Sequence, residues 1–369
     1  MPAKIVSGLR LFSPLVYRLC QSVKASIFVS ALLNLTVSVS GQTPRSWSPA
    51  EPKPQEVPRA WSQFIGAYGP DDDVYFILER GEKLILLRQN AGEWILAEQT
   101  SAGFDRKTEA RLAARFRRNS AGQIDFFNLG NYGVSRRQLG PSDGNQQQIK
   151  PLRPVDELTR EALTASPPSG NGPFRKADLV ELARLDPAIH LDIRYATSND
   201  FLGAPVYTQA RAFLQRPAGE ALLRVLHKLQ PLDYGLLIHD AYRPWYITKI
   251  FWEATPPEGK IFVADPAQGS RHNRGCAVDL TLYDLGTGKP IEMPGTYDEM
   301  SPRSFPNYPG GTSLQRWHRD LLRRAMESEG FTVYESEWWH FDYKDWREYP
   351  ILNVPFEKLD TGSGATLIH

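Results

Sequence analysis

The stretch Ser270–Asp279 constrains the chain most, because it joins a histidine, a turn and the start of a buried strand. His272 and Asp279 are seven residues apart, which is too long for one turn of an α-helix. This spacing suits one ligand in a loop and a second ligand on the strand that the loop feeds. Gly275 lets the loop turn, and the apolar run Cys276–Leu282 is typical of a buried strand.

A second cluster, Glu337-Trp338-Trp339-His340, lies near the C-terminal end. A catalytic zinc site needs three protein ligands, an open position for water and a base that is not a ligand. His272, Asp279 and His340 can supply the ligands, and Glu337 can supply the base. Glu337 and His340 would point to opposite faces of a regular strand, so the backbone must bend there if both face one metal.

Other interpretations of these residues remain open. Two histidines and two acids can also occur without a metal in a chain of 369 residues. Cys276 lies between two proposed ligands and could itself bind zinc, although the apolar residues that follow it favour a small buried strand residue. Glu335 is a rival base, and Glu337 could instead be a surface acid, which the adjacent tryptophans disfavour.

Arg243 is a candidate for stabilising negative charge. It follows a predicted buried strand at Gly235–Ile238 and precedes Pro244, so the backbone fixes its position. A guanidinium there can stabilise the charge that develops on the carbonyl oxygen during peptide hydrolysis. The alternative is a structural arginine that pairs with Asp240.

Two further stretches complete a pattern of four motifs. They are Leu191-Asp192-Ile193-Arg194-Tyr195-Ala196-Thr197 and Asp240-Ala241-Tyr242-Arg243-Pro244. Together with Ser270–Asp279 and Glu337–His340, they resemble the zinc D-alanyl-D-alanine dipeptidases of the VanX type in order and spacing. The resemblance covers about Leu179 to Pro355, roughly half of the chain. It departs from the family at Cys276, where a small residue such as serine is usual.

The resemblance implies a role for each site residue. It makes Glu337 the general base that takes a proton from water and passes it to the leaving amine. It places Arg243 beside the developing oxyanion. It assigns the substrate ammonium to Asp298, with Tyr195 near the same end, and a contact with the substrate carboxylate to Ser270. A pocket closed around both termini would exclude longer peptides.

The second half of the chain alternates helices with strands, which predicts an α+β catalytic domain. The resemblance implies the compact fold shared by DD-peptidases and Hedgehog-like domains. Apolar residues at helical spacing predict helices at Ala218–Leu229 and Leu314–Glu329. Further strands are predicted at Leu179–Leu182, Leu191–Tyr195 and Phe331–Tyr334.

Residues 59–140 predict a small antiparallel all-β domain that is barrel-like. Val74–Leu78 and Leu84–Leu87 flank the turn Arg80-Gly81-Glu82, and Ala121-Gly122 is another hairpin signal. The region faintly resembles small β-barrel modules appended to cell-envelope hydrolases. We expect either a module that contacts the cell wall or a folding spacer.

The N-terminal segment is typical of a secretory leader. Basic residues without an acid precede the apolar run Ser26–Val39, which is too short to span a bilayer comfortably. A signal peptide, a periplasmic or secreted location and no stable membrane span after its removal are therefore predicted, with an uncleaved anchor as the alternative. The predicted boundaries are 1–41 signal peptide, 42–58 proline-rich linker, 59–140 β domain, 141–173 linker, 174–356 zinc dipeptidase domain and 357–369 flexible tail. A short helix is predicted within the second linker, over Val155–Leu163.

Charge and cysteine content narrow the function classes further. A net charge of +1 gives no basic footprint for nucleic acid. Of the two cysteines, Cys20 lies in the predicted leader, which leaves one thiol and no internal disulfide. The sequence therefore predicts zinc-dependent hydrolysis of D-Ala-D-Ala in the bacterial envelope. The alternatives are a zinc carboxypeptidase or endopeptidase acting on peptidoglycan stem peptides, and an inactive envelope-binding protein, which Glu337 and Arg243 argue against.

Overall fold

The computed structural model divides into two compact units. The first includes residues 59–78 and 83–137, and the second includes residues 138–359. None of the described helices is both long and apolar enough to cross a membrane. The predicted signal peptide, residues 42–50 of the first linker and residues 360–369 of the tail lie outside the described residues, which are 51–89, 91–96, 99–100, 103–104, 111–112, 114–129, 132–140, 147–170 and 172–359.

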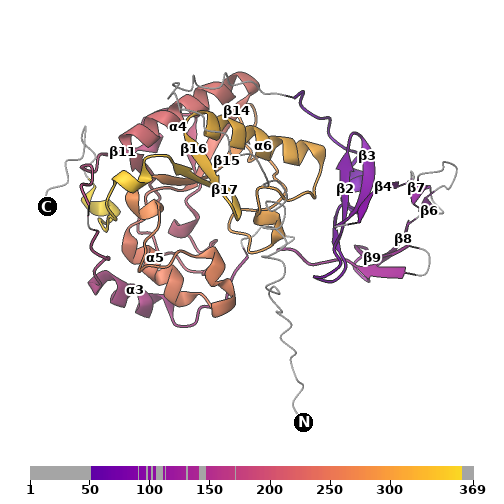
Figure 1. Cartoon of the computed structure of the whole chain (residues 1–369), viewed down its shortest axis with the longest axis horizontal. Coiled ribbons are helices and arrows are strands. Elements are labelled where there is room, and N and C mark those ends of the chain that lie inside the picture. Colours follow the sequence, from indigo (N-terminus) through magenta and orange to yellow (C-terminus); the bar gives the residue numbers. More distant parts are fainter. Residues whose placement is uncertain are drawn as a thin grey trace, which may run out of the picture. The chain divides into compact units, whose positions relative to one another are not determined.

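The second unit is built around a five-stranded mixed sheet (Figure 1). The strand order is β12-β14-β15-β17-β16, in which only β12 and β14 are parallel. Every residue of β14 is buried, as is every residue of β15 except the last, because both are central strands. A separate pair, β11 with β13, lies outside this sheet. The strands are β11 Leu179–Glu181, β12 Ile189–Leu191, β13 Phe213–Gln215, β14 Tyr234–Asp240, β15 Ala277–Asp284, β16 Phe331–Tyr334 and β17 Glu337–Tyr343.

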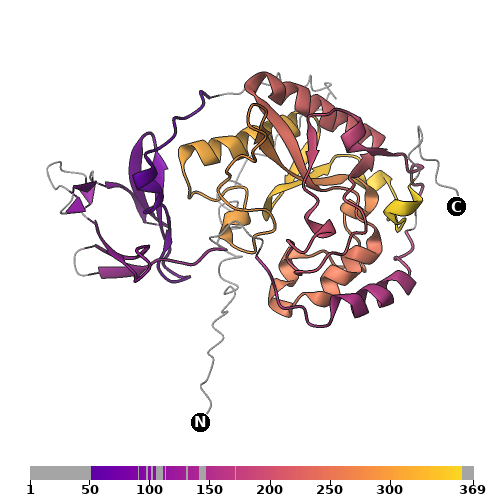
Figure 2. The same ribbon diagram turned by 180° about the vertical axis from the view of Figure 1, so that it is seen from behind.

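Helices lie on both sides of this sheet. α4 and α6 pack side by side on one side, and α3 and α5 pack together on the other (Figures 1 and 2). The two predicted amphipathic helices are confirmed as α4 and α6. Thr312 and Gln315 form a reciprocal capping box that fixes where α6 begins. The helices are α3 Val155–Thr164, α4 Arg216–Leu229, α5 Trp245–Ala254 and α6 Ser313–Ser328.

Short 3₁₀ helices connect these elements. The predicted strand Leu191–Tyr195 is wrong beyond Leu191, because the chain turns into the 3₁₀ helix η3 there. The turn brings the buried Tyr195 carbonyl to the backbone N–H groups of Val206 and Tyr207, which both donate to it at 2.9 Å. The 3₁₀ helices are η2 Leu182–Arg184, η3 Arg194–Ala196, η4 Gln230–Leu232, η5 Pro257–Phe262, η6 His272–Arg274, η7 Pro302–Ser304, η8 Trp346–Glu348 and η9 Phe356–Lys358.

Two β-bulges interrupt the regular pairing of strands in the central sheet, one between β14 and β15 and one between β16 and β17. The β14–β15 register shifts between Ile238 and Asp240. In the β16–β17 pair, Val333 lies opposite Phe341, whereas the next residue of β16, Tyr334, lies opposite Glu337. The bend predicted between Glu337 and His340 is thus confirmed, and its physical form is a bulge. Bulges re-aim side chains, and these two lie beside the candidate site.

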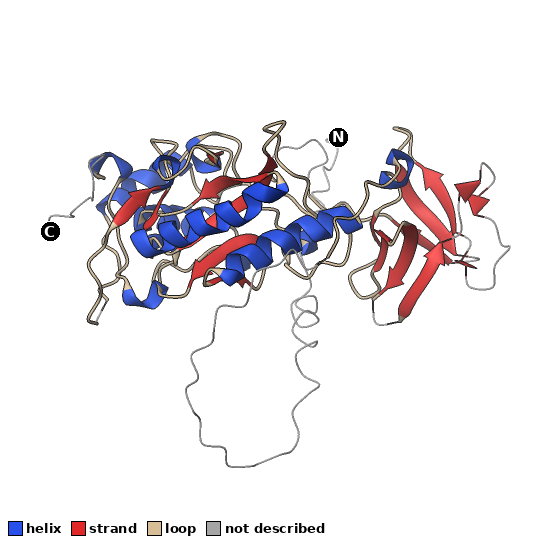
Figure 3. Cartoon of the chain, turned by 90° about the horizontal axis from the view of Figure 1, so that it is seen from above, coloured by secondary structure: helices blue, strands red, loops and turns tan. Residues whose placement is uncertain are grey.

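The first unit is a small β region with one short helix (Figure 3). Its described strands form a five-stranded sheet, a three-stranded sheet and a short pair, and their pairings do not close into a barrel. All pairings that are resolved are antiparallel except β4 with β7. Phe64, Tyr68, Ile77, Leu86 and Phe127 are completely buried in its core. The elements are α2 Arg59–Ser62, β1 Gly66–Tyr68, β2 Tyr75–Arg80, β3 Lys83–Arg88, β4 Gly92–Leu96, β5 Gln99–Thr100, β6 Gly103–Phe104, β7 Arg111–Leu112, β8 Ala114–Arg118, β9 Ile124–Leu129 and β10 Tyr132–Ser135.

The helix α3 confirms the short helix predicted over Val155–Leu163, but the surrounding segment 141–173, predicted to be a linker, packs through this helix into the core of the second unit. Leu158 and Ala162 are completely buried in the core of the second unit. We expect a fragment of residues 138–369 to melt cooperatively and a fragment of residues 170–369 to be largely unfolded. Losing a buried leucine alone costs about 2–5 kcal/mol, a large part of a typical domain's stability. Thermal melts followed by circular dichroism, with Leu158→Ala in the longer fragment as an intermediate case, check this. Equal melting of the two fragments would contradict it.

Candidate metal centre

Three side chains from separate elements converge over the paired strands β15 and β17 of the central sheet. His272 comes from η6, Asp279 from β15 and His340 from β17, and each offers a ligand atom within 4.8 Å of the others. His272 Nε2 lies 3.1 Å from His340 Nδ1 and 3.4 Å from Asp279 Oδ1. His340 Nδ1 lies 3.0 Å from Asp279 Oδ1. Asp279 and His340 are direct neighbours across the β15–β17 pair, which brings two of the three together.

Local sequence explains why His272 faces this point. Gly275 has φ +67°, in the left-handed region that favours glycine, and a Cβ there would lie 2.6 Å from Leu179. The turn therefore closes tightly before β15 begins. The Asn273 side-chain amide donates to the Arg243 carbonyl at 2.9 Å, so the loop that carries His272 is bonded to the loop that carries Arg243.

Hydrogen bonds to the outer ring nitrogens orient both imidazoles. His272 Nδ1 lies 2.6 Å from the Ala241 carbonyl oxygen, and His340 Nε2 lies 2.9 Å from Asp342 Oδ1. Both oxygens can only accept, so each of these nitrogens carries the hydrogen when the ring is neutral. The lone pairs of His272 Nε2 and His340 Nδ1 then point into the site. This arrangement, with an outer carbonyl or carboxylate behind each histidine, is typical of metal ligation.

The donor set fits a zinc-like divalent metal. Asp279 Oδ1 is buried and accepts no hydrogen bond from any described residue, although two imidazole nitrogens lie close to it. Three atoms with facing lone pairs repel one another unless a cation lies between them. Burial alone would lower the pKa of His340, but Asp342 and Asp279 beside it raise this pKa to about 10. The same carboxylates favour a metal ion, which would displace that proton.

Glu337 lies next to the three ligands without joining them. The bulge of β17 turns its carboxylate toward the same pocket, where Oε2 is 3.7 Å from His340 Nδ1. Its side chain is 15 % exposed. Burial raises the pKa of Glu337 to about 7, with His340 opposing the shift and Asp279 adding to it. A carboxylate with this pKa is suited to take and return a proton near neutral pH.

Arg243 pairs with Asp240 and also lines the pocket. Its Nε and Nη2 both contact Asp240 Oδ2, at 2.8 and 2.7 Å, and Tyr207 donates to Asp240 Oδ1 at 2.7 Å. Arg243 can therefore form the structural ion pair with Asp240 and still line the pocket that holds the candidate metal ligands. Burial would lower the pKa of Arg243, but Asp240 raises it well above the ordinary value, so the guanidinium stays charged. Its Nη2 lies 3.9 Å from Asp279 Oδ2.

The predicted substrate-binding residues lie around the same pocket. Tyr195 donates to Asp298 Oδ2 at 2.7 Å, and Asp298 has φ +53°, an uncommon conformation for a residue other than glycine. Burial raises the pKa of Asp298 well above its usual range, which means that the carboxylate lacks a full cationic partner. Ser270 is buried in the lining, and its hydroxyl accepts from the His272 backbone N–H at 3.2 Å.

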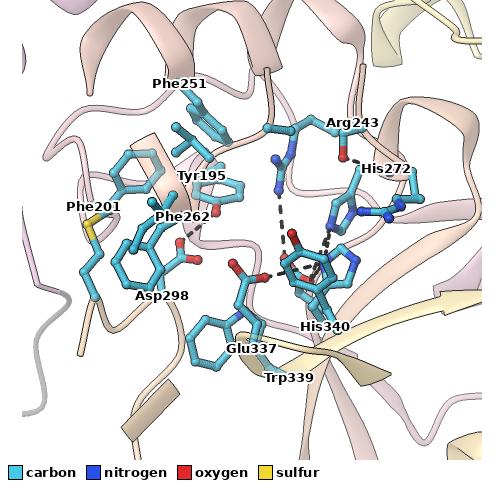
Figure 4. Close-up of a pocket in the computed structure, with 18 of the residues that line it drawn as sticks. Tyr195, Phe201, Arg243, Phe251, Phe262, His272, Asp298, Glu337, Trp339 and His340 are labelled. Carbon is cyan, nitrogen blue, oxygen red and sulfur yellow. Dashed lines mark hydrogen bonds and ion pairs between the residues drawn. The ribbon is translucent and has the colours of Figure 1, made fainter. Parts of the chain in front are cut away.

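The pocket is small and has a polar and an apolar part (Figure 4). Its volume is about 100 Å³, and it includes all eight residues predicted from the sequence. In the view of Figure 4, Tyr195 and Asp298 lie on one side of Glu337, and His272 and His340 lie on the other. The apolar part of the lining is formed by Phe201, Phe251, Ile261, Phe262, Val263, Met300 and Trp339.

Two alternatives from the sequence do not lie in this pocket. Cys276 is completely buried, and its thiol contacts the Arg274 carbonyl at 3.6 Å instead of joining the cluster of ligand atoms. Burial raises the pKa of the Cys276 thiol, which disfavours the thiolate that metal binding needs. Glu335 is exposed and is absent from the lining.

Sequence reasoning missed two residues that support the ligands. Asp342 is two positions after His340, so period-two alternation in the strand could have indicated that it shares the face of His340. Tyr297 donates its hydroxyl to Asp279 Oδ2 at 3.2 Å, and no local pattern points to this contact because 18 residues separate the two.

The fold and the site together define a metal-dependent hydrolase of small substrates, and comparisons name the family. A family model described as D-ala-D-ala dipeptidase matches residues 175–357. The chain is 36% identical over 179 residues to D-alanyl-D-alanine dipeptidase from Escherichia coli (strain K12), which covers 48% of this chain and 91% of the relative. It is 34% identical over 187 residues to the protein of the same name from Enterococcus faecalis, with 45% and 92% covered. The chain belongs to the D-Ala-D-Ala dipeptidase family of metallopeptidases.

A third relative supports the same assignment. D-alanyl-D-alanine dipeptidase from Streptomyces coelicolor is 32% identical over 186 residues, which is 46% of this chain and 92% of that protein. The match to the family model lies within the second unit and includes all the site residues. The first unit lies outside it.

Proposed function

We propose that the chain hydrolyses free D-Ala-D-Ala with one zinc ion held by His272, Asp279 and His340. The observation that carries this proposal is the convergence of three buried side chains, each of which offers one ligand atom within 4.8 Å of the others. Zinc, when bound, acts as a Lewis acid that makes hydrolysis by water feasible at neutral pH. The names of the relatives support the choice of substrate.

The chain's own residues divide the remaining work. Glu337 takes the proton from the attacking water and returns it to the leaving amine, which its pKa of about 7 and its place beside the ligands allow. Arg243, held by Asp240, stabilises the negative charge that develops on the scissile oxygen. Because Asp240 is itself held by Tyr207, the guanidinium is fixed before the substrate arrives.

Recognition of both substrate ends explains a preference for dipeptides. Asp298, steered by Tyr195, binds the free ammonium, and Ser270 contacts the carboxylate. A buried carboxylate without a full cationic partner gains much from an ammonium group and little from a neutral amide. The apolar lining then accepts the two methyl groups.

Blocking the substrate amine tests this proposal against the carboxypeptidase alternative. We expect kcat/KM for D-Ala-D-Ala to exceed that for N-acetyl-D-Ala-D-Ala by about a hundredfold or more, because the blocked substrate leaves Asp298 unpaired. D-Ala release from the zinc-loaded protein measures both values. Asp298→Asn should lower kcat/KM for the free dipeptide and therefore reduce its ratio to kcat/KM for the acetylated dipeptide. Equal hydrolysis of the two substrates would favour a carboxypeptidase that acts on longer stem peptides.

The proposal extends to the location of the protein and to its two units. The protein acts in the periplasm or outside the cell, which the leader-like composition of residues 1–41 supports. The second unit has the fold shared by DD-peptidases and Hedgehog-like domains, which its mixed sheet with helices on both sides supports. The first unit contacts the cell wall, and binding of the isolated β region to purified wall material tests that role.

A further inference from the structure

The apolar part of the metal-centre pocket is gathered at one end. Phe201, Phe251 and Phe262 lie on the side of the pocket away from the candidate metal ligands (Figure 4). The ring centroids of Phe201 and Phe251 are 5.0 Å apart, and the Tyr195 ring is 4.7 Å from that of Phe251. Tyr195 also donates to Asp298. The aromatic cluster therefore surrounds the carboxylate to which the substrate ammonium is assigned.

The 3₁₀ helix η5 continues this apolar wall. A Cβ at Gly259 would lie 3.9 Å from Met300 Sδ, so η5 packs beside the segment that follows Asp298. The helix ends with Ile261 and Phe262, and both of these side chains line the pocket. The wall thus extends from the aromatic cluster onto η5.

Exposure increases along the wall. Phe251 and Phe201 are 2 % and 3 % exposed, whereas Ile261 is 55 % exposed. A single exposed isoleucine is ordinary on a protein surface. Ile261, however, continues the apolar lining of a pocket, so a ligand that follows this wall outward covers it. Burial of that apolar surface stabilises the complex.

The two ends of a bound dipeptide meet different surroundings. The ammonium group and the side chain of the N-terminal residue are attached to the same carbon, so an ammonium held by Asp298 places that side chain beside the apolar wall. The carboxylate end, assigned to Ser270, meets the polar lining residues Arg271 and His272. An aliphatic side chain gains from contact with apolar surface but desolvates polar groups at the other end.

We propose that the pocket accepts a larger aliphatic side chain at the N-terminal residue of the dipeptide but not at the C-terminal residue. This inference rests on the proposed function, because it uses the assignment of the ammonium to Asp298. The methyl group of an N-terminal D-Ala contacts the inner part of the wall. The isobutyl group of an N-terminal D-Leu extends along Phe262 and covers Ile261. The substrate class is therefore D-dipeptides with an aliphatic N-terminal residue and a small C-terminal residue.

Two isomeric dipeptides test the proposal. The zinc-loaded full chain is given D-Leu-D-Ala and D-Ala-D-Leu, with D-Ala-D-Ala as the reference, and release of free amino acids is measured. We expect kcat/KM for D-Leu-D-Ala to exceed that for D-Ala-D-Leu about tenfold or more, as apolar pockets discriminate side chains that differ by a methylene or more. Equal values, the reverse order, or failure to cleave D-Leu-D-Ala by a chain that cleaves D-Ala-D-Ala would overturn the proposal.

Ile261→Ser tests the outer end of the wall. It should lower the ratio of kcat/KM for D-Leu-D-Ala to kcat/KM for D-Ala-D-Ala by about fourfold, the gain from burying roughly one methylene group. Leu163→Ser is the matched control, since Leu163 on α3 is also 55 % exposed and is absent from the pocket lining. Its ratio should equal that of the unmodified chain. An unchanged ratio in Ile261→Ser, or the same fall in both variants, would overturn the proposal.

A binding measurement separates this proposal from the proposed activity. If the chain hydrolyses none of the three dipeptides, the proposed function fails, but the rise in melting temperature that each isomer gives the zinc-loaded chain still reports which one the pocket accepts. D-Leu-D-Ala should raise the melting temperature more than D-Ala-D-Leu does. An equal or smaller rise with D-Leu-D-Ala would overturn the proposal.

Discussion

Glu337→Gln should lose most of its kcat for D-Ala-D-Ala while keeping its zinc and its substrate affinity. Glutamine preserves the size of the side chain but cannot accept a proton. A general base contributes typically about a hundredfold to ten-thousandfold in rate, and we expect a loss in this range. Because Glu337 Oε2 is 3.7 Å from His340 Nδ1 and is not one of the converging ligand atoms, metal content should not change. Steady-state kinetics together with metal analysis of the purified variant measure both quantities.

Glu335→Gln is the matched control for this experiment. It makes the same chemical change two residues earlier, at an exposed side chain outside the pocket. Its kinetics should match those of the unmodified chain. If Glu337→Gln hydrolyses D-Ala-D-Ala at a near-normal rate and Glu335→Gln loses kcat, Glu335 is the general base. Loss of zinc from Glu337→Gln would instead make Glu337 a ligand.

The parts of this protein that could be predicted from sequence are those that a local pattern encodes. Helices α4 and α6 have one apolar face and were predicted nearly to their ends. The spacing of His272, Asp279 and His340 suggested a site because ligand types and turn residues occur together. The bend required at Glu337 follows from strand geometry alone, whereas its form as a bulge depends on the pairing with β16.

The parts that were missed depend on tertiary packing. Seven of the ten residues of α5 are buried, so its outer face is narrow and consists of Lys249, Trp252 and Glu253, which is a weak helical signal in an otherwise apolar stretch. Helix α3 lies in a polar, proline-rich segment, and only its packing in the core shows that it belongs to the catalytic unit. Tyr297 supports Asp279 through a contact that the order of residues does not reveal, whereas strand alternation from His340 does indicate the face of Asp342.

Removing a ligand should have the largest effect on the metal itself. We expect His340→Ala to lose most of its zinc and its activity together, because only two protein ligands remain. Asp342→Asn keeps an oxygen that can accept from His340 Nε2 but removes the charge, and such changes typically weaken metal affinity about 10–100-fold. Zinc titration against a chelator of known affinity ranks the variants.

His227→Ala is the matched control for the ligand series, since that imidazole is 55 % exposed and lies outside the cluster. The expected order of zinc affinity is therefore His227→Ala, equal to the unmodified chain, then Asp342→Asn, then His340→Ala. This order separates a direct ligand from the group that orients it, which a loss of activity alone could not do. Full zinc occupancy in His340→Ala would show that the ligand assignment is wrong. Unchanged zinc affinity in Asp342→Asn would show that the charge of the Asp342 carboxylate does not contribute to metal binding.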